Sequence, residues 1–295
     1  MKDLNHPSKD GSLKGSPLKQ KIIVVCGQTA TGKSDLAVEI AKKYNGAVLS
    51  VDSRQIYRGG DLASGKVPLT NRGLYEGIEH FGVSIASMKR TYTVAQFQRY
   101  AKKIIEKILA SGRTPILCGG SGLWIDALVY GTEFPKVKPN KALRVKLAKL
   151  STSELFDKLT KLDPVRAKTV DRSNPFRLIR AIEIATAIGK VPRVKTRKPM
   201  YDVKWIVLSL SKTDLEQKVS KRLTARIKKG MVAEIRKLHD QGVSHKRLMA
   251  LGLEFKFTSL FLQKKLSRTE FETHLKKAIL QYAKRQDTWF KKFAK

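Results

Sequence analysis

The order of apolar and polar residues near the start of the chain predicts strands that alternate with helices. Residues 22–26 form an unbroken, largely β-branched apolar run, which is typical of a strand buried on both faces. From residue 34 to residue 44 the apolar positions recur at helical spacing. Residues 47–51 then predict a second strand, which delivers Asp52 to its carboxyl end.

The same alternation continues further along the chain. Thr93 and Gln96 have the spacing of a capping box, so we expect a helix from there to Ala110. Residues 115–118 predict a third strand, which ends in the glycine-rich sequence 119–122. Strands that alternate with helices and end in glycine turns predict an α/β fold with a parallel sheet. Ligands of such sheets bind at the carboxyl ends of the strands, so the turns after these three strands should meet there.

A change of pattern after the third strand divides the chain into two parts. Residues 137–201 are helical in pattern and rich in Lys and Arg, whereas residues 205–210 return to strand character. We therefore expect residues 21–136 and 202–295 to form an α/β core with C-terminal helices, interrupted by a helical insertion. Residues 1–20 lack the apolar segment of a signal peptide and predict a flexible tail.

The last helix is predicted to be amphipathic. Its apolar stripe predicts core packing, and it consists of Leu275, Ile279, Tyr282, Trp289 and Phe293. Lysines occupy another face of this helix, and that face is either a solvated surface or a contact with a polyanion.

The charge of the chain adds information that the apolar pattern does not carry. The 60 Lys and Arg residues exceed the 25 Asp and Glu residues, which leaves a formal net charge of +35. Such an excess favours a protein that binds nucleic acid and releases its counterions, although a generally lysine-rich composition is the alternative. No apolar stretch is long enough to span a bilayer, and Cys26 and Cys118 form no disulfide framework. We therefore expect a cytoplasmic protein that binds no membrane.

Residues 27–34 match the phosphate-loop pattern G-x-x-x-x-G-K-[ST] between the first strand and the first helix. Glycines let the backbone wrap around a phosphate, whose charge the loop N–H groups and the helix N-terminus stabilise. The predicted diphosphate- or nucleotide-binding residues are Gly27, Gln28, Thr29, Ala30, Thr31, Gly32, Lys33 and Ser34. Lys33 supplies a positive charge, and the Ser34 hydroxyl suits Mg²⁺ as the cofactor. The loop alone leaves ATP or GTP hydrolysis and small-molecule kinase chemistry open.

Further motifs give the chain a specific resemblance. The sequences at 52–58 (Asp-Ser-Arg-Gln-Ile-Tyr-Arg), 119–124 (Gly-Gly-Ser-Gly-Leu-Trp), 177–183 (Arg-Leu-Ile-Arg-Ala-Ile-Glu) and 283–290 (Ala-Lys-Arg-Gln-Asp-Thr-Trp-Phe) follow the phosphate loop in order. Together they resemble the tRNA dimethylallyltransferase (IPP transferase) family over nearly all of residues 21–293. The resemblance implies a P-loop parallel-sheet core with a helical insertion domain. It also implies transfer of a dimethylallyl group from dimethylallyl diphosphate to N6 of adenosine 37, beside the tRNA anticodon.

The resemblance also implies roles for individual residues. Asp52 would accept the proton of the adenine amine, Ser121 would hydrogen-bond near that amine, and Arg222 would reach the diphosphate. The residues implied to contact the anticodon stem-loop of tRNA are Asp52, Ser53, Arg54, Gln55, Arg144, Arg177, Leu178, Ile179, Arg180, Lys284, Arg285, Gln286 and Thr288. The target base would have to be flipped out of its loop to react. Nothing in the sequence demands an oligomer, so we expect a monomer.

Several positions depart from the family's pattern. Trp124, Lys218 and Arg226 replace a usual Tyr, Arg and Met, and residues 249–254 depart from the usual Ile-Gly-Tyr core, so a tRNA contact there stays open. Three other functions remain: an isopentenyltransferase acting on free adenine nucleotides, a P-loop kinase, and a non-catalytic RNA-binding protein. The first would not need the basic charge, and the second should bind and turn over ATP.

Overall fold

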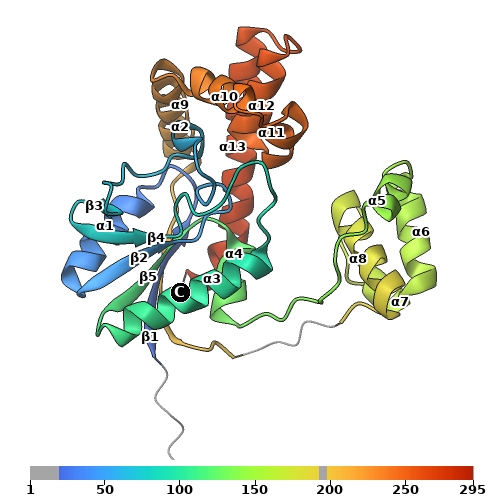
Figure 1. Ribbon diagram of the computed structural model, residues 1–295, viewed down its shortest axis with the longest axis horizontal. Helices are drawn as coiled ribbons and strands as arrows, with labels where there is room; N and C mark the ends of the chain where they lie inside the picture. The colour runs from blue at the N-terminus through green and yellow to red at the C-terminus, as the bar shows by residue number, and fades with distance from the viewer. Residues whose placement is uncertain (1–19, 193–197, 295) are drawn as a thin grey trace, which may run out of the picture. The chain divides into compact units, whose positions relative to one another are not determined.

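The structure, a computed structural model, describes residues 20–192 and 198–294 (Figure 1). The expected tail at residues 1–20 therefore falls almost wholly outside the described residues. The chain separates into two compact units, of which the first comprises residues 1–130 and 199–295 and the second residues 131–198. The sequence placed the corresponding insertion at residues 137–201. None of the described helices is both long and apolar enough to cross a membrane.

The first unit contains a six-stranded sheet in the order β3-β4-β2-β5-β1-β6. All neighbouring strands run parallel except β3 and β4, which form an antiparallel pair at one edge. The strands are β1 (Lys21–Gly27), β2 (Gly46–Ser50), β3 (Leu74–Tyr75), β4 (Ile78–Phe81), β5 (Thr114–Gly119) and β6 (Asp202–Leu208). The expected α/β fold and its four long strands are confirmed, whereas β3 and β4 are too short to leave a clear sequence pattern.

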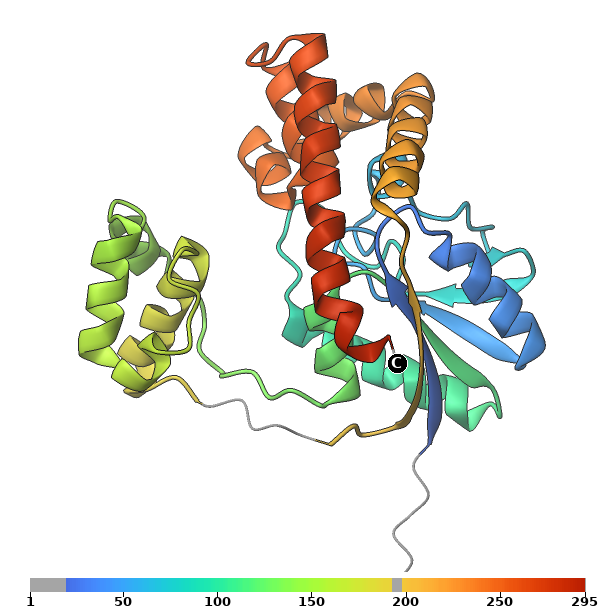
Figure 2. The same cartoon turned by 180° about the vertical axis from the view of Figure 1, so that it is seen from behind.

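Helices cover both faces of this sheet (Figures 1 and 2). The helices of the first unit are α1 (Lys33–Lys43), α2 (Asp61–Ser64), α3 (Val94–Ala110), α4 (Gly122–Val129), α9 (Lys212–Lys228), α10 (Met231–Asp240), α11 (His245–Leu251), α12 (Leu253–Leu262) and α13 (Arg268–Phe290), followed by the 3₁₀ turn η1 (Lys291–Phe293). Of these, α2 and α9 to α12 lie beyond the ends of the strands and not on a face of the sheet. Successive side chains of a strand point to opposite faces. Ile23 and Val25 of β1 accordingly pack with α1, whereas Ile22 and Val24 join the core formed with α3 and α13.

Local signals fix where these helices begin. Thr93 forms the expected capping box before α3: its hydroxyl accepts from the Gln96 N–H at 3.2 Å, and the Gln96 side chain accepts from the Thr93 N–H at 2.9 Å.

Cys26 and Cys118 are free, buried thiols, as expected for small core residues.

The second unit is helical in its described part. It consists of α5 (Lys141–Leu147), α6 (Thr152–Leu162), α7 (Pro164–Ala167) and α8 (Pro175–Ile188). Leu147, Leu155, Leu159, Leu178 and Ile182 form its small core. The unit therefore has an apolar centre of its own.

Candidate functional site

The phosphate loop joins the end of β1 to the start of α1. Gly27 has a φ of +131°, and a Cβ there would lie 2.0 Å from the carbonyl oxygen of Leu208, so β6 leaves room only for glycine. Gln28 anchors the loop to the chain after β6, because its carboxamide oxygen accepts from the Leu210 N–H at 2.9 Å. The loop is thus held in shape by the edge strand before any ligand binds.

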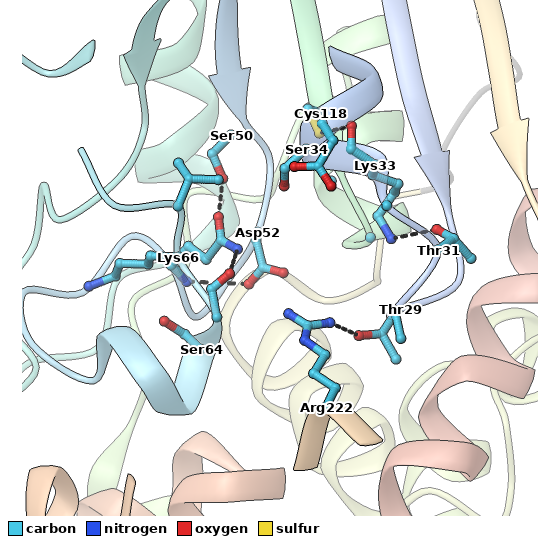
Figure 3. Close-up of a pocket in the computed structure, with 18 of the residues that line it drawn as sticks. Thr29, Thr31, Lys33, Ser34, Ser50, Asp52, Ser64, Lys66, Cys118 and Arg222 are labelled. Atoms are coloured by element: carbon cyan, nitrogen blue, oxygen red, sulfur yellow. Dashed lines mark hydrogen bonds between the residues drawn. The ribbon is translucent and has the colours of Figure 1, made fainter. Parts of the chain in front are cut away.

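A cavity of about 550 Å³ opens over this loop at the carboxyl ends of the strands. Figure 3 shows Lys33, Asp52 and Arg222 entering it from different elements. Its walls include all of residues 29–35 together with Val48, Ser50, Asp52, Gln55, Ser64, Gly65, Lys66, Val67, Pro68, Tyr75, His80, Val83, Cys118, Gly119, Gly120, Lys218, Lys221, Arg222, Ala225, Tyr282 and Gln286. The cavity therefore brings together the turns after β1, β2 and β5, as the parallel-sheet argument expected.

Lys33 places an ammonium group in this cavity. It donates to the carbonyl oxygen of Gln28 and, at 3.4 Å, to the hydroxyl of Thr31 (Figure 3). Burial, together with the nearby guanidinium of Arg222, lowers the pKa of Lys33 to about 8. A cation held with so little compensating charge will favour an anionic ligand.

Asp52 enters the cavity from the turn after β2. One carboxylate oxygen accepts from the N–H groups of Arg54 at 2.8 Å and Gln55 at 3.3 Å, which fixes the orientation of the side chain. Ser121 is not one of the residues in the cavity wall. Its hydroxyl accepts from the Ser53 N–H at 3.1 Å, so Ser121 holds the backbone next to Asp52.

Gln55 links the two sides of this turn. Its carboxamide oxygen accepts from the Ser50 hydroxyl at 2.9 Å, and its amide group donates to the Gly65 carbonyl at 3.2 Å. Lys66, which the sequence interpretation did not single out, completes the same wall. Its buried ammonium donates to the carbonyls of Tyr57 at 2.6 Å and Gly59 at 2.9 Å. The wall between β2 and β3 is thus stabilised by Gln55, which belongs to the motif at 52–58, and by Lys66, which no motif marked.

Helix α9 supplies the cationic wall opposite the phosphate loop. Lys218, Lys221 and Arg222 line the cavity from it at spacings of three and four, which place them on one helix face. Arg222 donates to the Thr29 hydroxyl at 3.2 Å (Figure 3). Burial lowers the pKa of Arg222, so this guanidinium also lacks full compensation by neighbouring charge.

Helix α13 supports the loop from the side. Gln286 is buried, accepts from the Thr29 N–H at 2.8 Å and donates to the Gly120 carbonyl at 3.0 Å. Both ends of its carboxamide are therefore bonded within the protein, although the resemblance implied a tRNA contact. Tyr282, which the apolar stripe assigned to the core, lines the cavity instead, and burial raises the pKa of its phenol. Lys284, Arg285 and Thr288 are exposed on the same helix.

Arg54 lies outside the cavity wall. It donates from Nε to the Leu251 carbonyl at 3.0 Å, and its guanidinium lies 5.2 Å from the ring centre of Tyr282. The chain segment around residues 249–254 is therefore joined to the Asp52 turn by this arginine.

The tRNA candidates of the second unit have ionic partners within that unit. Arg144 and Arg180 donate to the buried Glu183 carboxylate at 2.7 Å and 3.1 Å. Arg177 pairs with Asp171 at 3.4 Å and stays exposed. The side chain of Leu178 is buried in the unit's core and unavailable to RNA, and only Ile179 of the two apolar candidates is partly exposed.

The donor set suits a magnesium ion better than a transition metal. Within the described residues, no three His, Cys, Asp or Glu side chains are grouped closely enough to hold a metal. Ser34 and Asp52 line the same cavity (Figure 3). Mg²⁺ commonly uses one or two protein oxygens and completes its shell with phosphate oxygens and water, so these residues fit Mg²⁺ with a phosphate ligand.

Comparison with known proteins gives consistent matches. The family model described as IPP transferase matches residues 55–293. A tRNA dimethylallyltransferase 2 of Treponema denticola is 39% identical over 285 residues, which cover 94% of this chain and 93% of the relative. A tRNA dimethylallyltransferase of Treponema pallidum is 37% identical over 278 residues, which cover 92% and 86% of the two chains.

Solved structures are similar over the same span. A tRNA isopentenylpyrophosphate transferase from Staphylococcus epidermidis is 31% identical, with a TM-score of 0.66 and coverage of 92% of this chain and 90% of that one. A eukaryotic dimethylallyltransferase acting on tRNA is 27% identical, with a TM-score of 0.76 and coverage of 92% and 70%. The similarity therefore extends through both units.

Proposed function

Because the chain belongs to the IPP transferase family and is a tRNA dimethylallyltransferase, we propose that its transfer reaction takes place in the cavity over residues 27–34. The reaction moves a dimethylallyl group from dimethylallyl diphosphate to N6 of adenosine 37 in tRNA and releases diphosphate. The observation that carries the proposal is the meeting of the phosphate loop, Asp52 and Arg222 around one cavity.

The phosphate loop binds the diphosphate of the donor. Residues 27–34 offer backbone N–H groups, Lys33 offers its ammonium, and Arg222 approaches from α9. These groups stabilise the negative charge that develops on the leaving group as the allylic C–O bond breaks. Ser34 would hold Mg²⁺ together with the diphosphate, and the bound ion would supply further charge stabilisation. An isoprenoid diphosphate thus occupies the place that a nucleotide takes in other phosphate-loop proteins.

Asp52 accepts the proton of the attacking amine. The N6 amine of adenine is a weak nucleophile, so its proton must leave as the new C–N bond forms. The Asp52 carboxylate lines the cavity and is oriented by two backbone N–H groups. Ser121 acts one step away, by holding Ser53 in place.

The anticodon stem-loop binds across exposed basic side chains. On α13 these are Lys284 and Arg285, and in the second unit they include Arg177. Ser53, Arg54 and Gln55 surround the turn that the flipped base must pass to reach Asp52. The enzyme works in the cytoplasm, where its tRNA substrate is found.

The proposal is tested by incubating the protein with dimethylallyl diphosphate, Mg²⁺ and unmodified tRNA, followed by mass spectrometry of the nucleosides. We expect N6-dimethylallyladenosine, and no product on AMP. Prenylation of AMP without prenylation of tRNA would instead favour a transferase acting on free nucleotides.

Two further measurements test the assigned roles. Asp52→Asn keeps the size of the side chain and removes the base, so transfer should fall by at least about a hundredfold while tRNA binding is retained. Unchanged activity would remove Asp52 from this role.

The affinity for tRNA should also fall steeply from low to physiological salt. An affinity that does not change with salt would mean that phosphate contacts do not carry the binding.

A further inference from the structure

A buried ion pair lies directly behind Arg222. Arg226 stands one helical turn further along α9 and donates from Nη1 to Oε1 of Glu254 at 3.3 Å. Only 13% of the Arg226 side chain and 9% of the Glu254 side chain are exposed. Neither residue belongs to the cavity wall, so the pair does not itself contact a ligand there.

The two guanidinium groups of α9 lie together against Gly65. A Cβ at Gly65 would lie 1.5 Å from Nη2 of Arg226 and 2.3 Å from Nη2 of Arg222. Both groups therefore use the space that any larger residue at this position would occupy. Burial, and next the charge of Arg222, lower the pKa of Arg226 to about 10, so Arg226 remains charged at neutral pH. Arg222 is likewise a cation, because a guanidinium is not deprotonated in proteins.

Two positive charges thus share one buried carboxylate. Glu254 is hydrogen-bonded to Arg226, whereas Arg222 donates to the Thr29 hydroxyl at 3.2 Å and faces the cavity. The charge of Glu254 nevertheless acts on Arg222 and favours its charged form. A buried carboxylate that loses its cation is expected to pair with another nearby cation, because an unpaired buried charge is costly. Without Arg226, Arg222 is a cation on which the charge of Glu254 already acts.

We propose that Arg226 is a positioning residue, which engages Glu254 and so keeps Arg222 directed toward the anion in the cavity. The inference rests on the proposed function only in taking that anion to be a diphosphate. Gly65 is part of the arrangement because its missing side chain leaves room for both guanidinium groups. The pair therefore affects binding through Arg222 and not by touching the ligand.

The test is calorimetric binding of inorganic diphosphate in the presence of Mg²⁺, which needs neither tRNA nor turnover. Arg226→Met keeps an unbranched apolar stem and removes the guanidinium with its charge, and we expect affinity to fall about tenfold. Adding Glu254→Gln to that variant removes the competing carboxylate, so affinity should return to within about threefold of the wild type. A double variant that binds no better than Arg226→Met would overturn the proposal.

Three further arms separate positioning from a loss of folding. Arg226→Lys keeps a cation for Glu254 and should bind diphosphate almost as the wild type does. Glu254→Gln alone removes the carboxylate that would compete with the ligand for Arg222. A tenfold loss of diphosphate affinity in that variant would therefore contradict the proposal, even if Arg226→Met fails to fold. Arg236→Met, at an exposed arginine of α10, is the matched control and should change nothing. Thermal unfolding of each variant is recorded. If diphosphate affinity falls in step with thermal stability, whether or not the Glu254 carboxylate is present, the inference is also overturned.

The same variants distinguish this inference from the proposed function. In tRNA prenylation, the KM for dimethylallyl diphosphate should rise in Arg226→Met and recover in the double variant, with kcat within about threefold of the wild type. If diphosphate binding follows the expected pattern but no variant or wild-type protein prenylates tRNA, the positioning role stands and the proposed function fails.

Discussion

Raising the pH from about 7 to about 9 should weaken the binding of dimethylallyl diphosphate, because it removes the charge of Lys33. Burial lowers the pKa of this ammonium to about 8. The neighbouring thiols do not interfere, since burial raises the pKa of Cys26 and of Cys118 to about 12. The donor's terminal phosphate has its last pKa at about 6, so it is already about nine-tenths ionised at pH 7 and changes little over this range.

The size of the effect follows from the titration of one group. With a pKa of about 8, Lys33 of the free protein is charged in about nine-tenths of molecules at pH 7 and in about one-tenth at pH 9. A diphosphate beside the ammonium favours the charged form, so binding at pH 9 takes up nearly one proton. The Kd should therefore rise about tenfold over this interval, which is about 1.4 kcal/mol.

The same pKa has the opposite consequence for folding. The unfolded chain keeps the lysine proton up to its ordinary pKa of 10.5, whereas the folded protein releases it from about 8. The charge of Lys33 therefore opposes folding below pH 8, by at most about 3 kcal/mol. That cost is relieved as the pH rises toward 10.5, so the free energy of unfolding should increase there relative to Lys33→Met.

Calorimetry in two buffers of different ionisation enthalpy measures both the Kd and the proton uptake. Lys33→Met should bind weakly at either pH and take up no proton. Lys43→Met changes an exposed lysine at the end of α1 and should behave like the wild type. A Kd that is independent of pH in the wild type, with no proton uptake at pH 9, would refute the reasoning.

Three substitutions test the supports of the two units. Gly27→Ala should lower the free energy of unfolding by at least about 2 kcal/mol in chemical denaturation, because its Cβ would lie 2.0 Å from a carbonyl oxygen of β6; an unchanged midpoint would mean that the loop can move away. Gln286→Leu removes the partner of the Thr29 N–H and the shorter of the two hydrogen bonds to the Gly120 carbonyl, so it should cost about 2 kcal/mol and raise the donor KM. A variant with normal stability and KM would contradict this role. Glu183→Gln removes the buried carboxylate that Arg144 and Arg180 share, so the free energy of opening measured by hydrogen exchange should fall by about 3 kcal/mol in the second unit and stay unchanged in the first. Protection equal to that of the wild type would show that the ion pairs add no stability.

Local sequence patterns were sufficient for the main strands and for the phosphate loop. The apolar run before Gly27 and the helical spacing after Lys33 act within a few residues, so β1 and α1 could be located from sequence alone. The capping box at Thr93 is equally local. The short strands β3 and β4 were missed because strands of two and four residues are too short to establish a period.

The sequence by itself determined that the phosphate loop and Asp52 follow the first two strands along the chain, and that their side chains meet at the carboxyl ends of a parallel sheet. Only the tertiary structure decided what surrounds them. Gln286 reaches Thr29 across 257 positions of the chain, and Arg226 meets Glu254 through the packing of α9 and α12 beside the loop at Gly65. Such contacts leave no periodic signal, because they depend on which helix faces are brought together and not on neighbours in sequence.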